Sequence, residues 1–118
     1  MAASDQKGDR VKDIEPAVDD GELTRFQWEI LYLLAREDGQ SEYGLGIKRA
    51  LEAYYGEEVN HGRLYPNLDQ LVDAGYLKKR SLDKRTNLYE LTDEGKQLIH
   101  ADAQRRSTIV DGLLWGDA

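Results

Sequence analysis

The spacing of the apolar residues changes at Gly75, and this change limits what the chain can fold into. Before Gly75, three stretches carry apolar residues at helical spacing. After it, residues 76–81 and 87–91 have the pattern of two short strands with polar turn residues between them. A fourth helical pattern then runs to Trp115. The sequence therefore predicts a mainly α-helical chain with one small β-hairpin.

Each helical pattern begins with a residue that can accept hydrogen bonds from the first backbone N–H groups. In the first helix, Thr24 and Gln27 have the spacing of a capping box, in which each side chain bonds the backbone of the other residue. The expected caps of the other three helices are Ser41, Asn60 and Thr92. Two glycines in the second helix, Gly44 and Gly46, would allow close helix packing.

Three helices followed by a hairpin and a longer helix are the arrangement of the winged helix-turn-helix fold. In this fold the third helix, here residues 60–74, enters the major groove of DNA. The hairpin, here residues 77–91, is a wing that touches the DNA backbone or the minor groove. We therefore expect residues 23–92 to form a DNA-binding domain. Residues 1–22 hold seven acidic and three basic residues and few apolar ones, which predicts a disordered acidic tail.

The last helix is longer than a domain of this size needs to cover its core. In a monomer, apolar residues near its end would form an unusual exposed patch: Ile109, Val110, Leu113, Leu114 and Trp115. Pairing of two chains would bury that patch and place two recognition helices about one DNA turn apart. We therefore expect residues 93–118 to form a dimerisation helix and the chain to be a homodimer.

Charge is distributed unevenly along the chain, whose formal net charge is −7. Residues 61–88 hold six basic and three acidic side chains, which gives this segment a charge of +3. The other residues hold ten basic and twenty acidic side chains, which gives them a charge of −10. A single basic stretch in an acidic protein favours a local site for a polyanion such as double-stranded DNA. The alternative is that these Lys and Arg side chains simply decorate a solvated hairpin.

The third predicted helix carries the candidates for base contacts. If its leucines face the core, Arg63 and Gln70 face away from it and Asn67 lies at the flank. Arg pairs with guanine, and Asn or Gln with adenine, through two hydrogen bonds each. Arg63, Asn67 and Gln70 are therefore predicted to read bases; the alternative is that they are ordinary solvated residues. His61 falls on the inner side, which favours a packing or capping role.

Contacts with the DNA backbone need charge or polarity and little defined geometry. The candidates are Ser41, Lys48, Arg49, Asn60, Tyr65, Lys79, Arg80, Lys84 and Arg85. Arg85, at the expected tip of the wing, is placed to enter the minor groove. Lys48 and Arg49 of the second helix can equally be solvated.

The sequence excludes several other functions. It has no cysteine and two histidines, which excludes disulfides, thiol catalysis and a His-rich metal site. No Ser/His/Asp set, phosphate-binding loop or metal-ligand spacing occurs, so we expect neither enzymatic activity nor a cofactor. No apolar run is long enough for a membrane span and no secretory signal is visible, which favours a cytoplasmic protein.

Short motifs support the same interpretation. The third helix holds Leu64-Tyr65-Pro66 and a leucine-and-acid run that closes at Gly75, and the wing ends in an aromatic residue, Leu-Thr, an acidic pair and glycine at 89–95. Over residues 23–100 the chain resembles the PadR-like transcriptional regulators, which implies a DNA-binding winged helix-turn-helix protein. Its single last helix is similar to that of the short members. It departs from the family at residues 60–63, where Ser-Pro-Gly is usual, and in its short wing turn.

Two alternatives stay open. A winged-helix module can bind a protein instead of DNA, although such modules usually have a less basic wing. A small-molecule effector is not identifiable: aromatic residues can line a ligand site at a dimer seam or simply pack in the core, namely Trp28, Tyr32, Tyr54, Tyr55 and Trp115. The composition, with 13 Asp and 7 Lys, is similar to that of proteins from halophilic archaea.

Overall fold

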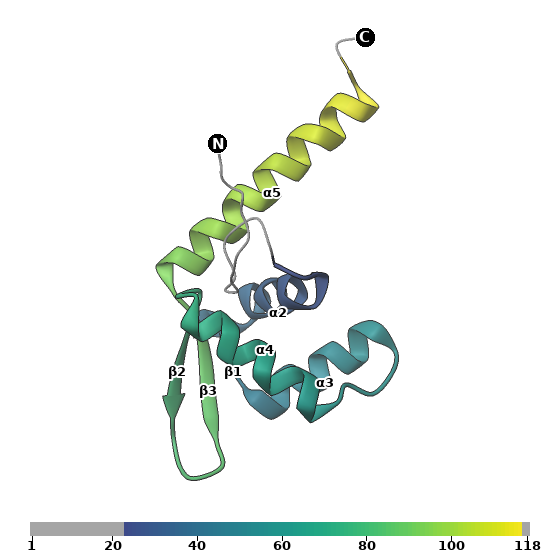
Figure 1. Cartoon of the computed structure of the whole chain (residues 1–118). Coiled ribbons are helices and arrows are strands. Elements are labelled where there is room, and N and C mark those ends of the chain that lie inside the picture. The colour runs from purple at the N-terminus through teal and green to yellow at the C-terminus, as the bar shows by residue number, and fades with distance from the viewer. Residues whose placement is uncertain (1–22, 117–118) are drawn as a thin grey trace, which may run out of the picture.

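The computed structural model describes residues 23–116, which form four α-helices and a small antiparallel sheet (Figure 1). The elements in chain order are α2 (Arg25–Arg36), the 3₁₀ turn η1 (Asp38–Gln40), β1 (Ser41–Tyr43), α3 (Gly44–Tyr55), α4 (His61–Asp73), β2 (Leu77–Ser81), β3 (Asn87–Leu91) and α5 (Asp93–Leu114). The mainly helical fold with a hairpin between its third and last helices is therefore confirmed. The acidic tail expected at residues 1–22 lies outside the described residues.

The sheet has a third strand, β1, where the sequence predicts the start of the second helix. Strand β3 lies between β1 and β2 and is antiparallel to both. Ser41 pairs with Glu90, and the cap position of α3 belongs to Tyr43, whose side chain makes no capping bond. The prediction that Ser41 caps this helix is wrong. Three residues are too few to show strand periodicity, whereas pairing with β3 satisfies their backbone groups.

The other three predicted caps are confirmed. Gln27 N donates to Thr24 Oγ1 at 3.1 Å and Thr24 N donates to Gln27 Oε1 at 3.0 Å, which completes the capping box of α2. Asn60 and Thr92 accept equivalent bonds at the starts of α4 and α5. Each bond satisfies a backbone N–H that has no partner within its own helix, and such a cap contributes about 1 kcal/mol.

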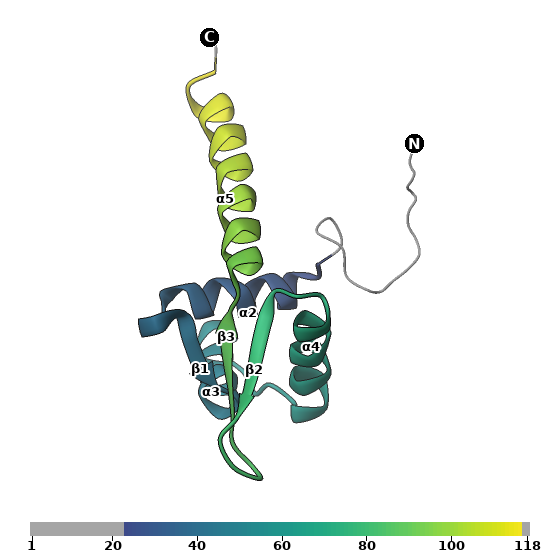
Figure 2. The ribbon, with the colours of Figure 1, turned by 90° about the vertical axis from the view of Figure 1, so that its left-hand side faces the viewer.

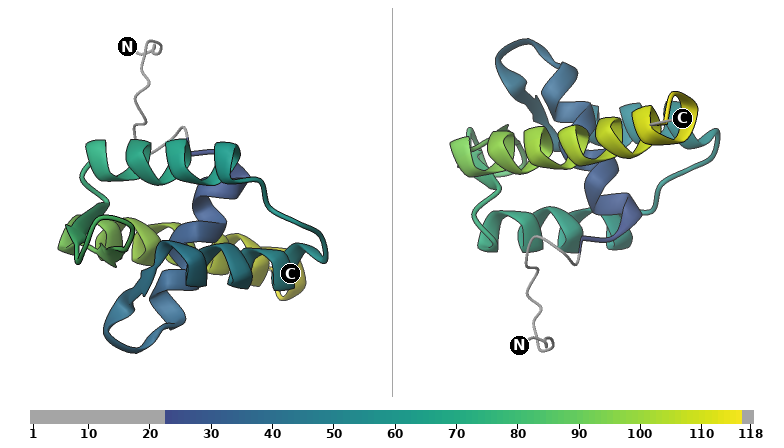
Figure 3. Two further views of the ribbon diagram at one scale, coloured as in Figure 1. Left: turned by 90° about the horizontal axis from the view of Figure 1, so that it is seen from below. Right: turned by 90° about the horizontal axis from the view of Figure 1, so that it is seen from above.

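Helices α2, α3 and α4 pack together against the sheet, and the core lies between these elements (Figures 2 and 3). Every one of them contributes side chains to it, among them Ile30, Leu34, Ile47, Leu51, Leu64, Leu68, Leu71, Leu77 and Tyr89. The leucines of α4 at 64, 68 and 71 are completely buried. This burial confirms the orientation of α4 from which the base-contact candidates follow.

Helix α5 leaves the domain as a rod (Figures 1 and 2). It is held by Asp102, which is 8% exposed and accepts hydrogen bonds from Tyr32 Oη of α2 at 2.7 Å and from Arg106 Nε at 2.9 Å. Beyond Asp102 every residue of the helix is exposed. Neither α5 nor any other helix between residues 23 and 116 combines the length and apolar character needed to cross a membrane.

The Tyr32–Asp102 bond makes stability depend on alkaline pH. Burial, and then the hydrogen bond to Asp102, raises the pKa of Tyr32 from 10.0 to about 12. The folded state therefore favours the neutral phenol, so this contribution to stability is complete below pH 10 and is lost as the pH rises towards about 12.

We expect Tyr32→Phe to lower the unfolding free energy by about 1 kcal/mol at neutral pH through loss of the hydrogen bond. We also expect the variant to lose less stability than wild type as the pH is raised above 10.0, the ordinary pKa of a tyrosine. Chemical denaturation across the alkaline range measures both effects. Tyr54→Phe, at a residue 62% exposed, is the matched control and should behave as wild type. An equal alkaline loss in wild type and Tyr32→Phe would contradict the prediction.

Candidate nucleic-acid interface

Helix α4, the start of α3 and the wing lie at the end of the domain away from α5. Helix α4 packs beside β2, and the turn between β2 and β3 projects from the far end of the sheet (Figures 1 and 2). We call this combination the α4–wing surface: α4, residues 43–49 of β1 and α3, and the wing, residues 77–91.

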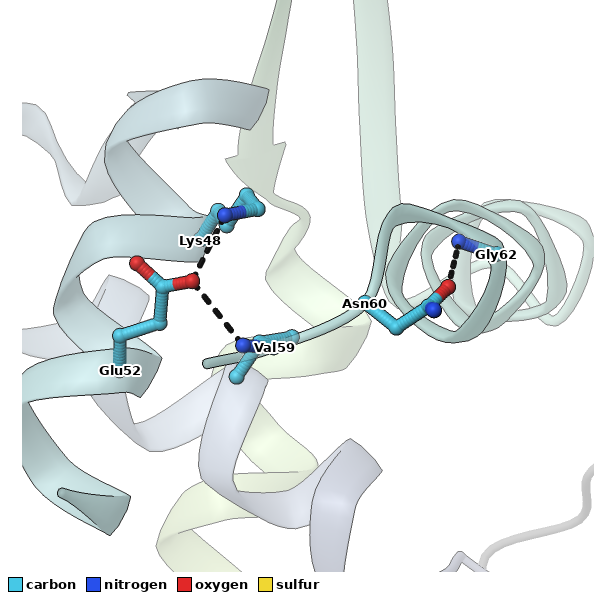
Figure 4. Close-up of polar contacts among 5 residues, drawn as sticks. All are labelled: Lys48, Glu52, Val59, Asn60 and Gly62. Atoms are coloured by element: carbon cyan, nitrogen blue, oxygen red, sulfur yellow. Dashed lines mark hydrogen bonds and ion pairs between the residues drawn. The ribbon is translucent and has the colours of Figure 1, made fainter. Parts of the chain in front are cut away.

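One carboxylate fixes the connection between α3 and α4 (Figure 4). Glu52 Oε2 accepts hydrogen bonds from Lys48 Nζ at 2.6 Å and from Val59 N at 3.0 Å. The bond from Lys48, and then that from Val59, holds the pKa of Glu52 below its usual range. The Lys48 side chain is only 18% exposed in this ion pair. Arg49, which is exposed, is therefore the more accessible cation of α3.

The three base-contact candidates lie together on one side of α4, against the first turn of α2. Gln27, 2% exposed, donates from Nε2 to Asn67 Oδ1 at 3.0 Å and to Gln70 Oε1 at 2.8 Å. Asn67 Nδ2 donates to the carbonyl oxygen of Arg63 at 2.7 Å. The Arg63 guanidinium lies 3.9 Å from the ring centroid of Phe26, a cation–π contact. Arg63 and Gln70 are exposed, and Asn67 is half-buried.

Tyr65 fills the space between α4 and the start of α3. Its ring stacks on His61 with centroids 5.6 Å apart, and its hydroxyl lies 2.8 Å from where a Cβ on Gly44 would stand. Gly44 therefore permits the close helix packing that the sequence suggested. His61 is exposed, so its predicted inward orientation is wrong. It is the first residue of α4, and its side chain lies against Tyr65 instead of among the buried leucines.

Two cations of the wing strands are in ion pairs. Lys79 Nζ lies 3.5 Å from Asp69 Oδ1, and Arg80 lies 3.4 Å from Glu90 Oε1. Both pairs are solvent-exposed, and pairs of this kind are weak and easily screened by salt. A phosphate can therefore compete for these two side chains.

Asp83 orders the turn that carries the other two wing cations, Lys84 and Arg85. Its Oδ1 accepts a hydrogen bond from Arg85 N at 2.8 Å, and its carbonyl oxygen accepts one from Ser81 Oγ at 3.2 Å. The bond from Arg85 N, and then one from the Thr86 side chain, lowers the pKa of Asp83. Lys84 and Arg85 are exposed at the tip, where charge can meet a phosphate without a precise geometry.

A hollow of about 400 Å³ lies between the start of α3 and the wing. Arg49, Tyr65 and Arg85 line it together with the first residues of α3, and Glu42 lines it too. Because the cap residue of α3, Tyr43, makes no side-chain capping bond, the first N–H groups of the helix can donate hydrogen bonds to an anion. Three residues predicted to contact the DNA backbone, Arg49, Tyr65 and Arg85, thus lie around one hollow. Of the other candidates, Ser41 lies within β1 and Asn60 caps α4.

The predicted dimer residues all lie at the exposed end of α5. Their exposed fractions are Ile109 55%, Val110 47%, Leu113 80%, Leu114 65% and Trp115 74%. An apolar cluster this exposed is unusual in a soluble monomer. Among residues 23–116 no group of His, Asp and Glu side chains is arranged to hold a metal ion.

The aromatic residues considered for a ligand site are spread over several places. Trp28 and Tyr32 line a hollow of about 750 Å³ between α2 and α5. Tyr32 and Tyr54 line another, of about 390 Å³, between α2 and α3. Tyr55 stacks on Phe26 of the core.

The sequence did not reveal the roles of Gln27 and Glu52, which lie outside the α4–wing surface but bond residues within or next to it. Gln27 was identifiable as a capping-box residue, but its bonds to α4 join residues 40 and 43 positions apart. The spacing of Lys48 and Glu52, four residues apart in a helix, was the available signal for their ion pair.

The arrangement defines a winged-helix protein: a helix-turn-helix pair on a third helix, a β-hairpin wing, and an exposed polar face on the recognition helix. The chain belongs to the transcriptional regulator PadR-like family, whose model matches residues 30–101. The resemblance seen in the motifs is thereby confirmed, and the chain is a member of a winged-helix family of DNA-binding transcriptional regulators.

Two curated relatives are transcriptional regulators. The chain is 29% identical over 104 residues to the transcriptional activator GvpE2 of Halobacterium salinarum, a match that covers 81% of this chain and 53% of that protein. It is 35% identical over 60 residues to the negative transcriptional regulator PadR of Bacillus subtilis, covering 42% of this chain and 33% of that one. The chain thus spans about half and one third of the lengths of these relatives.

Solved structures of RosR are similar at higher identity. A complex structure of hsRosR is 52% identical with a TM-score of 0.74, covering 80% of this chain and 81% of that chain. A structure of H. salinarum RosR grown from NaBr is 48% identical with a TM-score of 0.69, and the match covers 84% of this chain and 96% of that chain. A MarR family regulator from Streptomyces coelicolor in complex with DNA shares the fold at 18% identity and a TM-score of 0.65, covering 81% and 57%.

Proposed function

We propose that this chain is a sequence-specific DNA-binding regulator of transcription that acts as a homodimer. Residues 23–92 form its DNA-binding domain, and residues 93–118, which contain α5, form its dimerisation segment. Helix α4 lies in the major groove, and the wing lies on the DNA backbone or in the minor groove. The main support is the polar row of Arg63, Asn67 and Gln70, held in place by α2 beside a wing with exposed cations, in a member of this family.

Arg63 is the strongest candidate for a base contact. Its cation–π contact with Phe26 orients the guanidinium without using its N–H donors. Those donors can make the two parallel bonds that guanine O6 and N7 accept. Around the hollow, Arg49, Tyr65 and Arg85 together with the start of α3 hold a backbone phosphate. Further backbone contacts come from Lys79, Arg80 and Lys84, and weaker ones from Ser41, Lys48 and Asn60.

Substitutions separate base contacts from backbone contacts. We expect Arg63→Ala to lower affinity for the cognate site by about 1–3 kcal/mol and to relax base preference at one position per half-site. Arg85→Ala should weaken binding to cognate and random duplexes alike. Lys96→Ala is the matched control and should have little effect, because Lys96 is a solvent-exposed cation of α5, outside the α4–wing surface.

Titration of labelled cognate and random duplexes, at one salt concentration, measures these effects. If Arg63→Ala weakens both duplexes equally, Arg63 is a phosphate contact and the proposed docking of α4 is wrong. If wild type binds no duplex better than random DNA, the alternative of a protein-binding winged-helix module replaces the proposed function.

The exposed end of α5 supports the homodimer. Its apolar side chains begin at Ile109, beyond the last bond that ties the helix to the domain, at Asp102. The domain therefore does not need them for its own core. A second copy of the same helix would remove them from water and give the two-fold symmetry that paired recognition helices require.

Truncation after Arg106 tests the dimer. It removes the apolar patch but keeps the Asp102–Arg106 bond, so the winged domain should stay folded. We expect the wild type to sediment as a dimer at micromolar concentration, and the truncated chain to sediment as a monomer that loses specific DNA binding. Leu113→Glu, at a residue 80% exposed, should have the same effect with less perturbation. A monomeric wild type would contradict the prediction.

The charge distribution supports function at high salt. Outside residues 61–88 the chain carries −10, and these acids repel one another and DNA. The screening length falls to about 3 Å at about 1 M salt, which removes both penalties. Cations taken up between the acidic surface and the phosphates would also offset the counterion release that usually weakens DNA binding as salt rises. The similar regulators from H. salinarum agree with this proposal.

We expect the melting temperature to rise with KCl into the molar range. DNA affinity should fall much less steeply than the number of phosphate contacts implies, or even rise. Thermal melts and binding titrations from about 0.2 to about 2 M KCl span the change in screening and measure both. A steep, monotonic loss of affinity without a gain in melting temperature would show an ordinary acidic regulator instead.

A further inference from the structure

The backbone fixes the orientation of three amide side chains between α2 and α4. Gln27 Oε1 accepts from the Thr24 backbone N–H at 3.0 Å, so this atom must be the oxygen and the other must be the nitrogen. Because Nε2 only donates, the atoms that it meets on Asn67 and Gln70 must be oxygens. Asn67 gives an independent check, because its other amide atom lies against the carbonyl oxygen of Arg63. A carbonyl oxygen only accepts hydrogen bonds, so this amide atom must be the nitrogen Nδ2. The two contacts of Asn67 therefore give the same assignment.

This assignment limits what Gln70 can offer to DNA. Recognition of adenine by Gln needs its oxygen for N6 and its nitrogen for N7. One of the two lone pairs of the Gln70 oxygen accepts from Gln27 at 2.8 Å, and this bond turns the oxygen towards a residue only 2% exposed, so the NH₂ group is the part of the amide turned outward. Rotation of Gln70 would leave a donor of Gln27 unpaired at a site only 2% exposed, which is costly. An NH₂ group alone is best matched by guanine, which offers two acceptors, O6 and N7, and by thymine O4, whereas adenine offers the single acceptor N7 beside its N6 donor.

We propose that Gln27, which lies behind the α4–wing surface and does not touch DNA, determines base specificity through Gln70. It holds Gln70 as a hydrogen-bond donor and so favours guanine or thymine over adenine at the position that Gln70 faces, because the second bond of the usual Gln–adenine pair, from N6 to the Gln oxygen, is not made. This proposal rests on the proposed function, because it requires α4 to lie in the major groove. It also corrects the simpler expectation that an exposed Gln on a recognition helix reads adenine.

Selection of bound duplexes from a randomised pool, followed by sequencing, tests the proposal on the full-length chain. Comparison with Gln70→Ala first identifies the base position that depends on Gln70. Wild type should prefer guanine or thymine there. Gln27→Met, which has similar length and no hydrogen-bonding amide, releases the Gln70 oxygen and should raise the frequency of adenine at that position about five- to tenfold, the size of one hydrogen bond.

Gln27→Glu is the opposite variant. Its carboxylate can still accept from Thr24 N, but it presents an acceptor to Gln70 and so should turn the amide round. The oxygen of Gln70 then faces DNA, and the preference should move to bases with a donor, cytosine or adenine. In the Gln70→Ala background neither change at position 27 should alter base preference.

The outcomes separate this proposal from the proposed function. A wild-type preference for adenine at the Gln70 position, or no position that depends on Gln70, overturns the role of Gln27, and neither result needs a Gln27 variant to fold. Equal loss of affinity for all sequences in folded Gln27 variants, with base preference unchanged, also overturns it, because Gln27 then only braces the helix. Absence of any sequence preference in wild type instead overturns the proposed function itself.

Discussion

The structure depends on helix α2, because each side of this helix holds a different part of the molecule. Ile30 and Leu34 are completely buried in the core. Gln27 bonds two residues of α4, and Tyr32 bonds Asp102 of α5. Apolar packing alone tolerates small slides and rotations, whereas a buried hydrogen bond is lost when its geometry changes. The polar bonds of α2 therefore set the position of the recognition helix and of the last helix relative to one common element.

The accessible positive charge of the α4–wing surface is smaller than the sequence suggests. Lys79 and Arg80 already lie near carboxylates of Asp69 and Glu90, at 3.5 and 3.4 Å. A phosphate that binds these cations must displace or share them, which reduces the sequence-independent part of the binding free energy. In the proposed complex, directional hydrogen bonds from α4 would then carry a larger share of the binding free energy. This balance would favour discrimination between sequences over tight binding to any DNA.

The sequence predicts the element order because each helix has its own cap and its own apolar stripe. The capping box of Thr24 and Gln27 and the buried leucines of α4 are local patterns, and the structure confirms both. Strand β1 could not be predicted, since its three residues pair with β3 more than 40 positions later. The same reason hid the second role of Gln27. The helical spacing of α4 placed Arg63 and Gln70 on the surface correctly, but their contacts with α2 depend on how two distant helices cross.

The joint between α2 and α5 gives the proposed dimer its geometry. The twelve residues that follow Asp102, up to Leu114, extend the helix by about 18 Å, at about 1.5 Å per residue. A rotation of about 10° at Asp102 would move the winged domain relative to the dimer seam by about 3 Å, close to the rise of one base pair, about 3.4 Å. The spacing between half-sites in the proposed dimer is therefore sensitive to the angle between α5 and the winged domain. A carboxylate that is 8% exposed and bonded by Tyr32 Oη and Arg106 Nε fixes the angle more sharply than apolar contacts would. In the proposed dimer, the bond that anchors α5 to the domain would thus also set the register in which two recognition helices meet one DNA duplex.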